Sequence, residues 1–227
     1  MNFEHKDILI LGDSFCELRS LPIDWPFIVS QKLSNSSEKT RGHGFGGSSW
    51  WSVRKRLLKE LELHVPKVLI LCHTEPNRIP NDYDHGLNSA SCFAAQTNTN
   101  RIQTHNYPLE PWQEKKIAMA GHLYYEELWS RDYCKWAMVS WFKELDDLVE
   151  VYKIPCVIHL RCFDHGIKYI FKNGMTVKEN LVDMSLVGNE YRNHFTEEMN
   201  KKVGNRLVEL VLNYQPGLQE LTLKNEI

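Results

Sequence analysis

Three short, largely apolar runs stand out from the pattern of hydrophobic and polar positions along the chain. They cover residues 8–11, 68–72 and 155–160, and polar residues follow each of them at once. Runs of this length without regular polar alternation are typical of strands buried on both faces, as in a parallel sheet. We therefore predict these segments as inner strands of one sheet.

Between and after these runs, apolar residues recur at helical spacing. The spacing predicts four helices, from Asp24 to about Lys32, from Ser48 or Ser49 to about Leu61, from Glu114 to about Tyr152 with a break near Ser130, and from Thr196 to about Asn213. The aromatic residues of the third helix, Trp136 among them, are expected in the core. Strands that alternate with helices favour a parallel sheet covered on both faces, which is a three-layer α/β/α sandwich.

The remaining segments have weaker patterns. Residues 41–45 are compatible with a poor second strand, residues 161–180 with irregular structure, residues 181–187 with a short final strand, and the tail from Gln215 with a surface extension. Polar residues dominate between 81 and 111, where apolar positions have no regular period, as in long loops. We expect one domain over the whole chain, with an inserted loop or subdomain at about 79–120.

Composition and charge narrow the class of protein. The 227 residues are 42% hydrophobic and 11% aromatic, enough to bury a sizeable core. The net charge of −2, without a long run of one sign, argues against a nucleic-acid-binding surface. No apolar stretch approaches the roughly 20 residues of a membrane helix, and the first residues do not resemble a signal peptide. We expect a cytoplasmic protein with neither nucleic-acid nor membrane partners.

The six cysteines are scattered without Cys-x-x-Cys pairs. Their placement in predicted strands favours reduced, buried thiols, and their spacing does not favour a zinc site. We expect neither a metal nor a cofactor.

Polar clusters follow two of the predicted strands. Gly12-Asp13-Ser14 comes directly after the first strand, and the cluster from His73 to Arg78 follows the second. A glycine-rich segment at 42–49 lies between them, but its spacing does not match the phosphate-binding motifs. Open α/β sheets place their sites at the carboxyl ends of strands, although such residues also form ordinary turns. His159, inside the third strand, is expected to be structural.

The order of these clusters, with His194 ahead of the last predicted helix, resembles the SGNH hydrolases, also called the GDSL esterase family. The resemblance runs from Asp7 to about Leu210. It implies a flavodoxin-like three-layer α/β/α fold and an enzyme that hydrolyses esters, thioesters or acetylated substrates. It implies Ser14 as the nucleophile, His194 as the base, and Gly47 as a main-chain donor to the oxyanion. Asp13, within the first block, becomes a candidate substrate-binding residue.

The third block departs from the family pattern, which is Gly-x-Asn-Asp. Direct superposition puts Glu75 at the asparagine position, and a small shift brings Asn77 there instead. We favour Asn77 because an amide can donate a hydrogen bond to an oxyanion and an ionised carboxylate cannot.

The last block also departs from its pattern, Asp-x-x-His, because Tyr191 stands three residues before His194. Glu190, one residue further back, could orient the imidazole. Alternatively a main-chain carbonyl orients it, which leaves a Ser–His dyad that still works with its oxyanion donors.

Three functions remain open at this point. The first is a serine hydrolase acting on a small-molecule or carbohydrate ester. The second is a binding or structural protein on the same scaffold with weakened catalysis. The third, with the least support, is a flavin- or nucleotide-binding protein. The weak blocks and the lack of a leader are compatible with a phage-encoded protein, and the oligomeric state is open.

Overall fold

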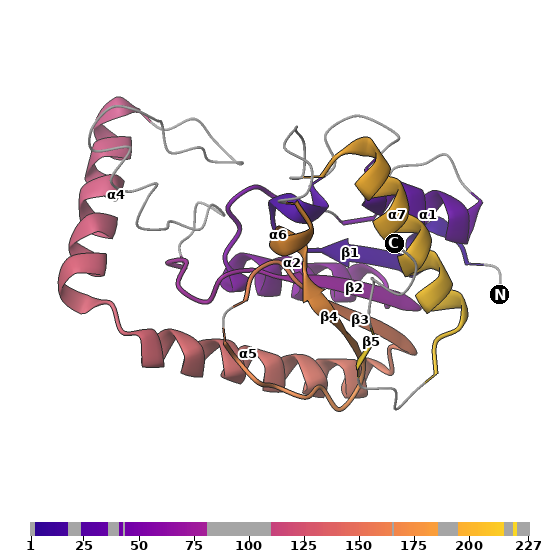
Figure 1. Cartoon of the computed structure of the whole chain (residues 1–227). Coiled ribbons are helices and arrows are strands. Elements are labelled where there is room, and N and C mark those ends of the chain that lie inside the picture. Colours follow the sequence, from indigo (N-terminus) through magenta and orange to yellow (C-terminus); the bar gives the residue numbers. More distant parts are fainter. Residues whose placement is uncertain are drawn as a thin grey trace.

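A parallel sheet forms the centre of the protein in a computed structural model that describes residues 3–17, 24–35, 41–42, 44–80, 110–164, 166–185, 195–215 and 220–221 (Figure 1). Its five strands lie in the order β1 (Ile8–Leu11), β2 (Val68–His73), β3 (Cys156–Arg161), β4 (Met175–Asn180) and β5 (Glu220–Leu221). Every neighbouring pair is parallel. The three predicted inner strands are therefore confirmed.

The predicted second strand is reduced to two isolated bridges on the other edge of β1. Leu9 pairs with Arg41, and Gly12 pairs with Gly44, both in the parallel sense. At Gly44 an added Cβ would lie 1.7 Å from the Asp13 main-chain oxygen, so only glycine allows this approach. The chain thus passes from one side of β1 to β2 on the other side, and open sheets place their sites at such a switch.

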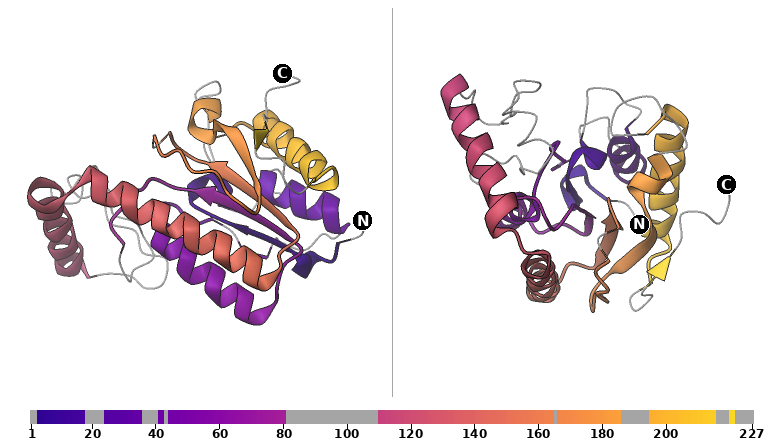
Figure 2. Two further views of the ribbon diagram at one scale, coloured as in Figure 1. Left: turned by 90° about the horizontal axis from the view of Figure 1, so that it is seen from below. Right: turned by 60° about the vertical axis from the view of Figure 1, so that its left-hand side comes forward.

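Helices cover both faces of the sheet (Figure 2). The α-helices are α1 (Trp25–Ser34), α2 (Trp50–Leu63), α4 (Pro111–Leu123), α5 (Arg131–Tyr152), α6 (Leu181–Ser185) and α7 (Glu197–Leu212). Short turns η1 (His5–Asp7) and η2 (Ser14–Cys16) are 3-10 helices, and η3 (Tyr124–Leu128) is a π-helix. The Ser49, Ser130 and Thr196 hydroxyls accept main-chain N–H groups and start α2, α5 and α7. The predicted helices and the break near Ser130 are confirmed.

The alternation of side chains along β1 divides the core into two layers. Ile8 and Ile10 pack with α1 and α7, whereas Leu9 and Leu11 pack with α2 and α5. All four side chains are at most 1% exposed. Because both faces of the strand are covered, every residue of β1 is apolar, which explains why its pattern lacks polar alternation.

Two predictions for the chain after β3 are wrong. Residues 161–180 are not irregular throughout, because β4 occupies their end, with Met175 and Val177 buried and polar residues between and after them. Residues 181–185 form α6 rather than a strand. Leu181 and Met184 are both buried, and a spacing of three residues puts them on one face of a helix.

The tail and one aromatic residue also need correction. Glu220 and Leu221, within the predicted surface extension, pair with β4 as a short strand. Trp136 is 64% exposed rather than in the core. It lies on the outer face of α5, together with the exposed Ser140 and Lys143, whereas its neighbours Ala137 and Met138 are buried.

Before the main part of α5 lies a segment that we call the arm, residues 111–135, which comprises α4, η3 and the start of α5. The predicted insertion at 79–120 overlaps the beginning of the arm, and its residues 81–109 lie outside the described residues. In Figure 1, α4 stands away from the sheet at the end of α5. None of the described helices combines the length and apolar character needed to span a membrane.

Candidate functional site

One guanidinium group joins three segments at the carboxyl edge of the sheet, the two polar clusters and the glycine-rich segment, which we call together the three polar clusters. Arg78 Nη1 donates to Asp13 Oδ2 at 3.4 Å and to the Ser48 main-chain oxygen at 3.0 Å. Its Nε donates to Glu75 Oε2 at 3.3 Å. The turn after β1, the glycine-rich segment and the chain after β2 therefore meet at Arg78.

Arg78 is only 6% exposed, and its guanidinium carbon lies 5.4 Å from the centre of the Phe163 ring. A buried cation costs several kcal/mol of solvation free energy unless charged or polar partners compensate it. Two carboxylates and a carbonyl do so here. Sequence reasoning gave Arg78 no role. The available signal was an arginine close behind a buried strand, at the edge where two carboxylates were also expected.

Asp13 holds the turn that carries Ser14. Its fully buried carboxylate accepts the Phe15 N–H at 3.0 Å and the Cys162 S–H at 3.1 Å through Oδ1. The other oxygen faces Arg78. All of these contacts are internal, so the geometry gives Asp13 a role in fixing the turn.

Ser14 begins η2 and is half-buried. Two buried thiols lie next to the preceding residues, Cys72 against Gly12 and Cys162 against Asp13, and burial raises the pKa of both, which keeps them neutral. The five described cysteines are free and buried, as the sequence predicts, and Cys92 lies outside the described residues. Neutral buried thiols are poor nucleophiles, so the hydroxyl of Ser14 is the nucleophile candidate in this turn.

Gly47 occupies the third position of a turn in which the Ser48 N–H donates to the Phe45 oxygen at 3.0 Å. Its φ of 76° is the left-handed value that type II turns require at this position. Among the described residues, no hydrogen bond partner is found for the Gly47 N–H.

Hydrogen bonds attach this glycine turn to the turn of Ser14. The Gly44 N–H donates to the Cys16 oxygen at 2.9 Å. Arg56 Nη2 donates both to Ser48 Oγ at 2.7 Å and to the Gly12 oxygen at 3.2 Å. The backbone just before Gly47 is therefore hydrogen-bonded to the turn that carries Ser14.

Glu75 and Asn77, the two candidates for the third block, differ in their contacts. The Glu75 carboxylate is engaged by Arg78. The Asn77 main-chain oxygen accepts the Tyr125 hydroxyl at 2.6 Å, while its buried side-chain Oδ1 has no hydrogen bond partner among the described residues. An unsatisfied buried polar atom costs about 1–3 kcal/mol, so this oxygen is better explained if a donor from a ligand completes its bonding.

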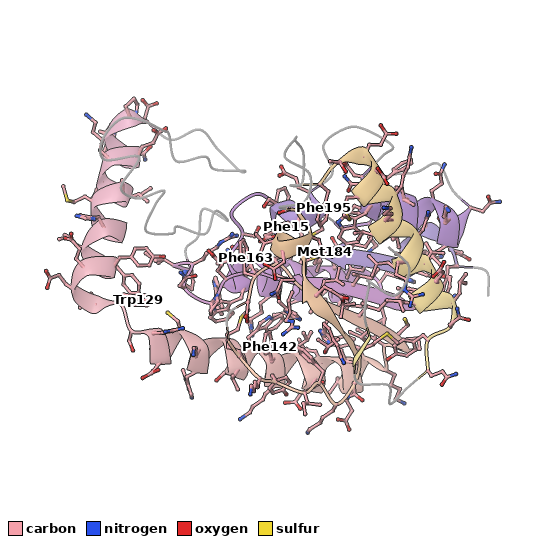
Figure 3. All side chains as sticks on the ribbon, viewed as in Figure 1. Phe15, Trp129, Phe142, Phe163, Met184 and Phe195 are labelled. Carbon is pink, nitrogen blue, oxygen red and sulfur yellow. The ribbon has the colours of Figure 1, made fainter. Side chains whose placement is uncertain are left out.

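A cavity of about 390 Å³ opens beside Asn77. Its lining includes Glu75, Asn77, Phe163 and Asp164 from the sheet edge and Trp129, Arg131 and Lys135 from the arm. Figure 3 shows Phe163 close to Phe15, and Trp129 at the bend between α4 and α5. The arm therefore supplies one wall of a cavity whose other wall belongs to the candidate site.

His194, Glu190 and Tyr191 lie outside the described residues. Phe195, the next residue after His194, is buried, and its ring centre lies 5.6 Å from that of Phe15, the residue after Ser14. Figure 3 shows both rings at the carboxyl end of β1.

A second polar group lies at the ends of β2 and β3. His73 Nε2 and His159 Nδ1 are 3.0 Å apart, and the ring centres of His159 and Phe171 are 3.4 Å apart in a stacked arrangement. Desolvation lowers the pKa of the fully buried His159 to about 3. A neutral, stacked imidazole agrees with the structural role expected for this residue.

Within the described ranges, no three His, Cys, Asp or Glu side chains are arranged to hold a metal ion. Comparison of the chain with protein-family models, with curated proteins and with solved structures found no match.

Proposed function

We propose that the protein is a serine ester hydrolase with Ser14 as nucleophile and His194 as general base. The observation that carries the proposal is the contact of one guanidinium, that of Arg78, with all three polar clusters. The clusters have the order along the chain that the SGNH blocks have. The positions of the 41–44 segment and β2 on opposite sides of β1 also agree with a flavodoxin-like strand order.

The packing of Phe195 on Phe15 supports the role of His194. Phe15 directly follows Ser14 in the chain, and Phe195 directly follows His194. Because consecutive Cα atoms lie about 3.8 Å apart, contact between the two phenylalanines favours a short distance between Ser14 and His194. An imidazole has an ordinary pKa near 6.5 and can accept and return a proton near pH 7.

In the proposed reaction, His194 takes the proton of the Ser14 hydroxyl as Ser14 Oγ attacks the carbonyl carbon of the ester. The developing negative charge receives hydrogen bonds from the Gly47 N–H and the Asn77 amide. The protonated imidazole gives its proton to the departing alcohol, which leaves an acyl group on Ser14. Water, deprotonated by His194, then releases the acid and restores the serine.

Either Glu190 or a main-chain carbonyl orients the imidazole of His194. Glu190→Gln separates the two arrangements. A triad predicts a large fall in kcat for this variant, whereas a dyad predicts a rate close to that of the wild type.

Hydrolysis of short-chain p-nitrophenyl esters tests the proposal. Ser14→Ala and His194→Ala should each reduce kcat by about a thousandfold or more, and the double variant should be little worse, because the two groups act as a unit. Ser140→Ala is the matched control, since the hydroxyl of this exposed serine of α5 donates to the Trp136 oxygen of its own helix. Hydrolysis by Ser14→Ala at the wild-type rate would overturn the proposal.

The alternative is a binding protein on the same scaffold, and Tyr191 at the position of the family's aspartate favours it. That function predicts that the purified wild type hydrolyses none of these esters while a ligand still occupies the cavity beside Asn77.

A further inference from the structure

The cavity beside Asn77 contains two cations that are not neutralised within the described residues. Arg131 and Lys135 both line it, and neither has an ion pair or side-chain hydrogen bond with the described part of the chain. The two acids of the same lining are in a different state. Glu75 is paired with Arg78, and Asp164 accepts the Gly166 N–H.

The positions of these cations are unfavourable for the helix that carries them. Arg131 is the first residue of α5, and cations near a helix N-terminus are disfavoured by the helix dipole. Lys135 stands four residues later, and like charges at this spacing repel each other by about 0.2–0.5 kcal/mol. Side chains that break such local rules are expected where a function requires them.

Aromatic and amide groups complete the lining. Trp129 is 40% exposed at the bend of the arm, and Phe163 lies on the opposite side of the cavity, next to Arg78 (Figure 3). Flat apolar side chains of this kind pack against rings. Asn77 contributes an amide oxygen without a hydrogen bond partner in the described part of the chain, at the end of the cavity that belongs to the candidate site.

We propose that this cavity binds a carboxylate-bearing ring of the ester substrate, with Arg131 and Lys135 holding the carboxylate. This inference rests on the proposed function, because it assigns the ring to the substrate of the Ser14 site. A guanidinium presents parallel N–H donors that match the two carboxylate oxygens, and the ammonium adds a second charge. The volume of about 390 Å³ is in the range of small-molecule sites and suits a single substituted ring.

Two esters with similar leaving groups test the substrate class. These are 4-acetoxybenzoate, which carries a carboxylate on its ring, and its neutral methyl ester, cleaved at the acetyl group. We expect the wild type to hydrolyse the acid with a kcat/KM about tenfold or more above that of the methyl ester, a preference that weakens as added salt screens the charges. Arg131→Gln combined with Lys135→Gln should bring the ratio close to one. Lys143→Gln, an exposed lysine further along α5, is the matched control and should keep the ratio.

Binding of 4-acetamidobenzoate, which has an amide in place of the ester, provides a readout without catalysis. Calorimetry should detect binding to the wild type and a loss of about tenfold or more in affinity in the double variant, with thermal unfolding used to check that both are folded. Hydrolysis of both esters at equal kcat/KM would overturn the inference and leave the proposed function standing. Hydrolysis of the p-nitrophenyl esters but of neither of these two would likewise overturn the inference alone. Should none of the esters be hydrolysed, the proposed function fails. Binding that depends on Arg131 and Lys135 would then still support the charged cavity, and equal binding by the variant would overturn it.

Discussion

The carboxyl edge of the sheet buries polar groups in two places and does so in opposite ways. Between β1 and β2, Arg78 keeps its charge and is compensated by Asp13 and Glu75. Between β2 and β3, His73 and His159 form a close pair among aromatic rings, and burial lowers the pKa of His159 to about 3. The first place retains charge in a buried site, and the second excludes it.

The difference separates a group that positions loops from a group that fills space. A buried ion pair adds little net stability compared with apolar residues of similar volume, because desolvation offsets the attraction. The contacts of Arg78 reach three different loops, so they fix the relative positions of the Ser14 turn, the Gly47 turn and the Asn77 segment. The histidine pair joins two neighbouring strands that already pair along six residues, so it adds packing rather than position.

Replacing Arg78 should give the largest effect on this comparison. Arg78→Met leaves the buried Asp13 carboxylate without its cation, and removing one member of a buried pair typically costs about 3–5 kcal/mol. We expect the free energy of unfolding in urea at pH 7 to fall by that amount, together with the loss of esterase activity.

The double variant Asp13→Asn with Arg78→Met is the control for this prediction. With neither charge present, part of the lost stability should return, but the loops lose their common partner and activity should stay low. A single Arg78→Met variant with wild-type stability would contradict a compensated buried charge at this position.

Arg78 also marks the limit of what the sequence could predict. Strands β1, β2 and β3, the helix start at Thr196 and the break near Ser130 are set by neighbouring residues, and they were predicted correctly. The start of α2 was predicted at Ser48 or Ser49, and it is Ser49. The rule that strand ends carry sites brought the clusters together in the prediction. It could not identify Arg78 as their common partner, because that depends on side-chain directions across three loops.

The wrong predictions for residues 161–180 and for Trp136 also concern features that local sequence does not determine. In β4 only Met175 and Val177 are buried, so the alternation is too short to distinguish a strand from a loop, and pairing with β3 decides the outcome. Trp136 was expected among the buried aromatic residues of α5, but it lies on the exposed face of the helix with Ser140 and Lys143. A large aromatic residue can stand on the solvent face of an amphipathic helix, so its type alone does not place it in the core.

Lowering the pH should reduce the free energy of unfolding by a smaller amount, through the buried His159. In the unfolded chain His159 binds a proton below about its ordinary pKa of 6.5, and in the folded protein only near 3. Between these values the unfolded state binds more protons, so stability decreases as pH falls, by up to about 1.4 kcal/mol per pH unit.

Urea unfolding at several pH values between 6.5 and 5 measures this slope. His159→Gln should reduce it. His122→Gln, at a half-buried residue of α4 outside the aromatic stack, is the control and should keep the slope. An equal slope in the wild type and in His159→Gln would show that the imidazole is not buried in its neutral form.

The smallest difference, about 1 kcal/mol in the free energy of unfolding, is expected between variants of two tyrosines, one at each place. Tyr125 donates to the Asn77 main-chain oxygen at 2.6 Å, and Tyr169 donates to Asp146 Oδ2 at 2.8 Å beside the aromatic stack. Tyr125→Phe removes a bond to a neutral acceptor, worth about 0.5–1.5 kcal/mol, and Tyr169→Phe removes one to a carboxylate, worth about 1.5–3 kcal/mol. If Asn77 is an oxyanion donor, the order reverses for catalysis. Tyr125→Phe should lower kcat several-fold, because the Asn77 segment is held less firmly. Tyr169→Phe should lower stability more and leave kcat nearly unchanged.

Chemical unfolding and steady-state kinetics on the same preparations measure the free energy of unfolding and kcat. If kcat falls more in the variant that loses more stability, the distinction between a positioning contact and a packing contact is wrong.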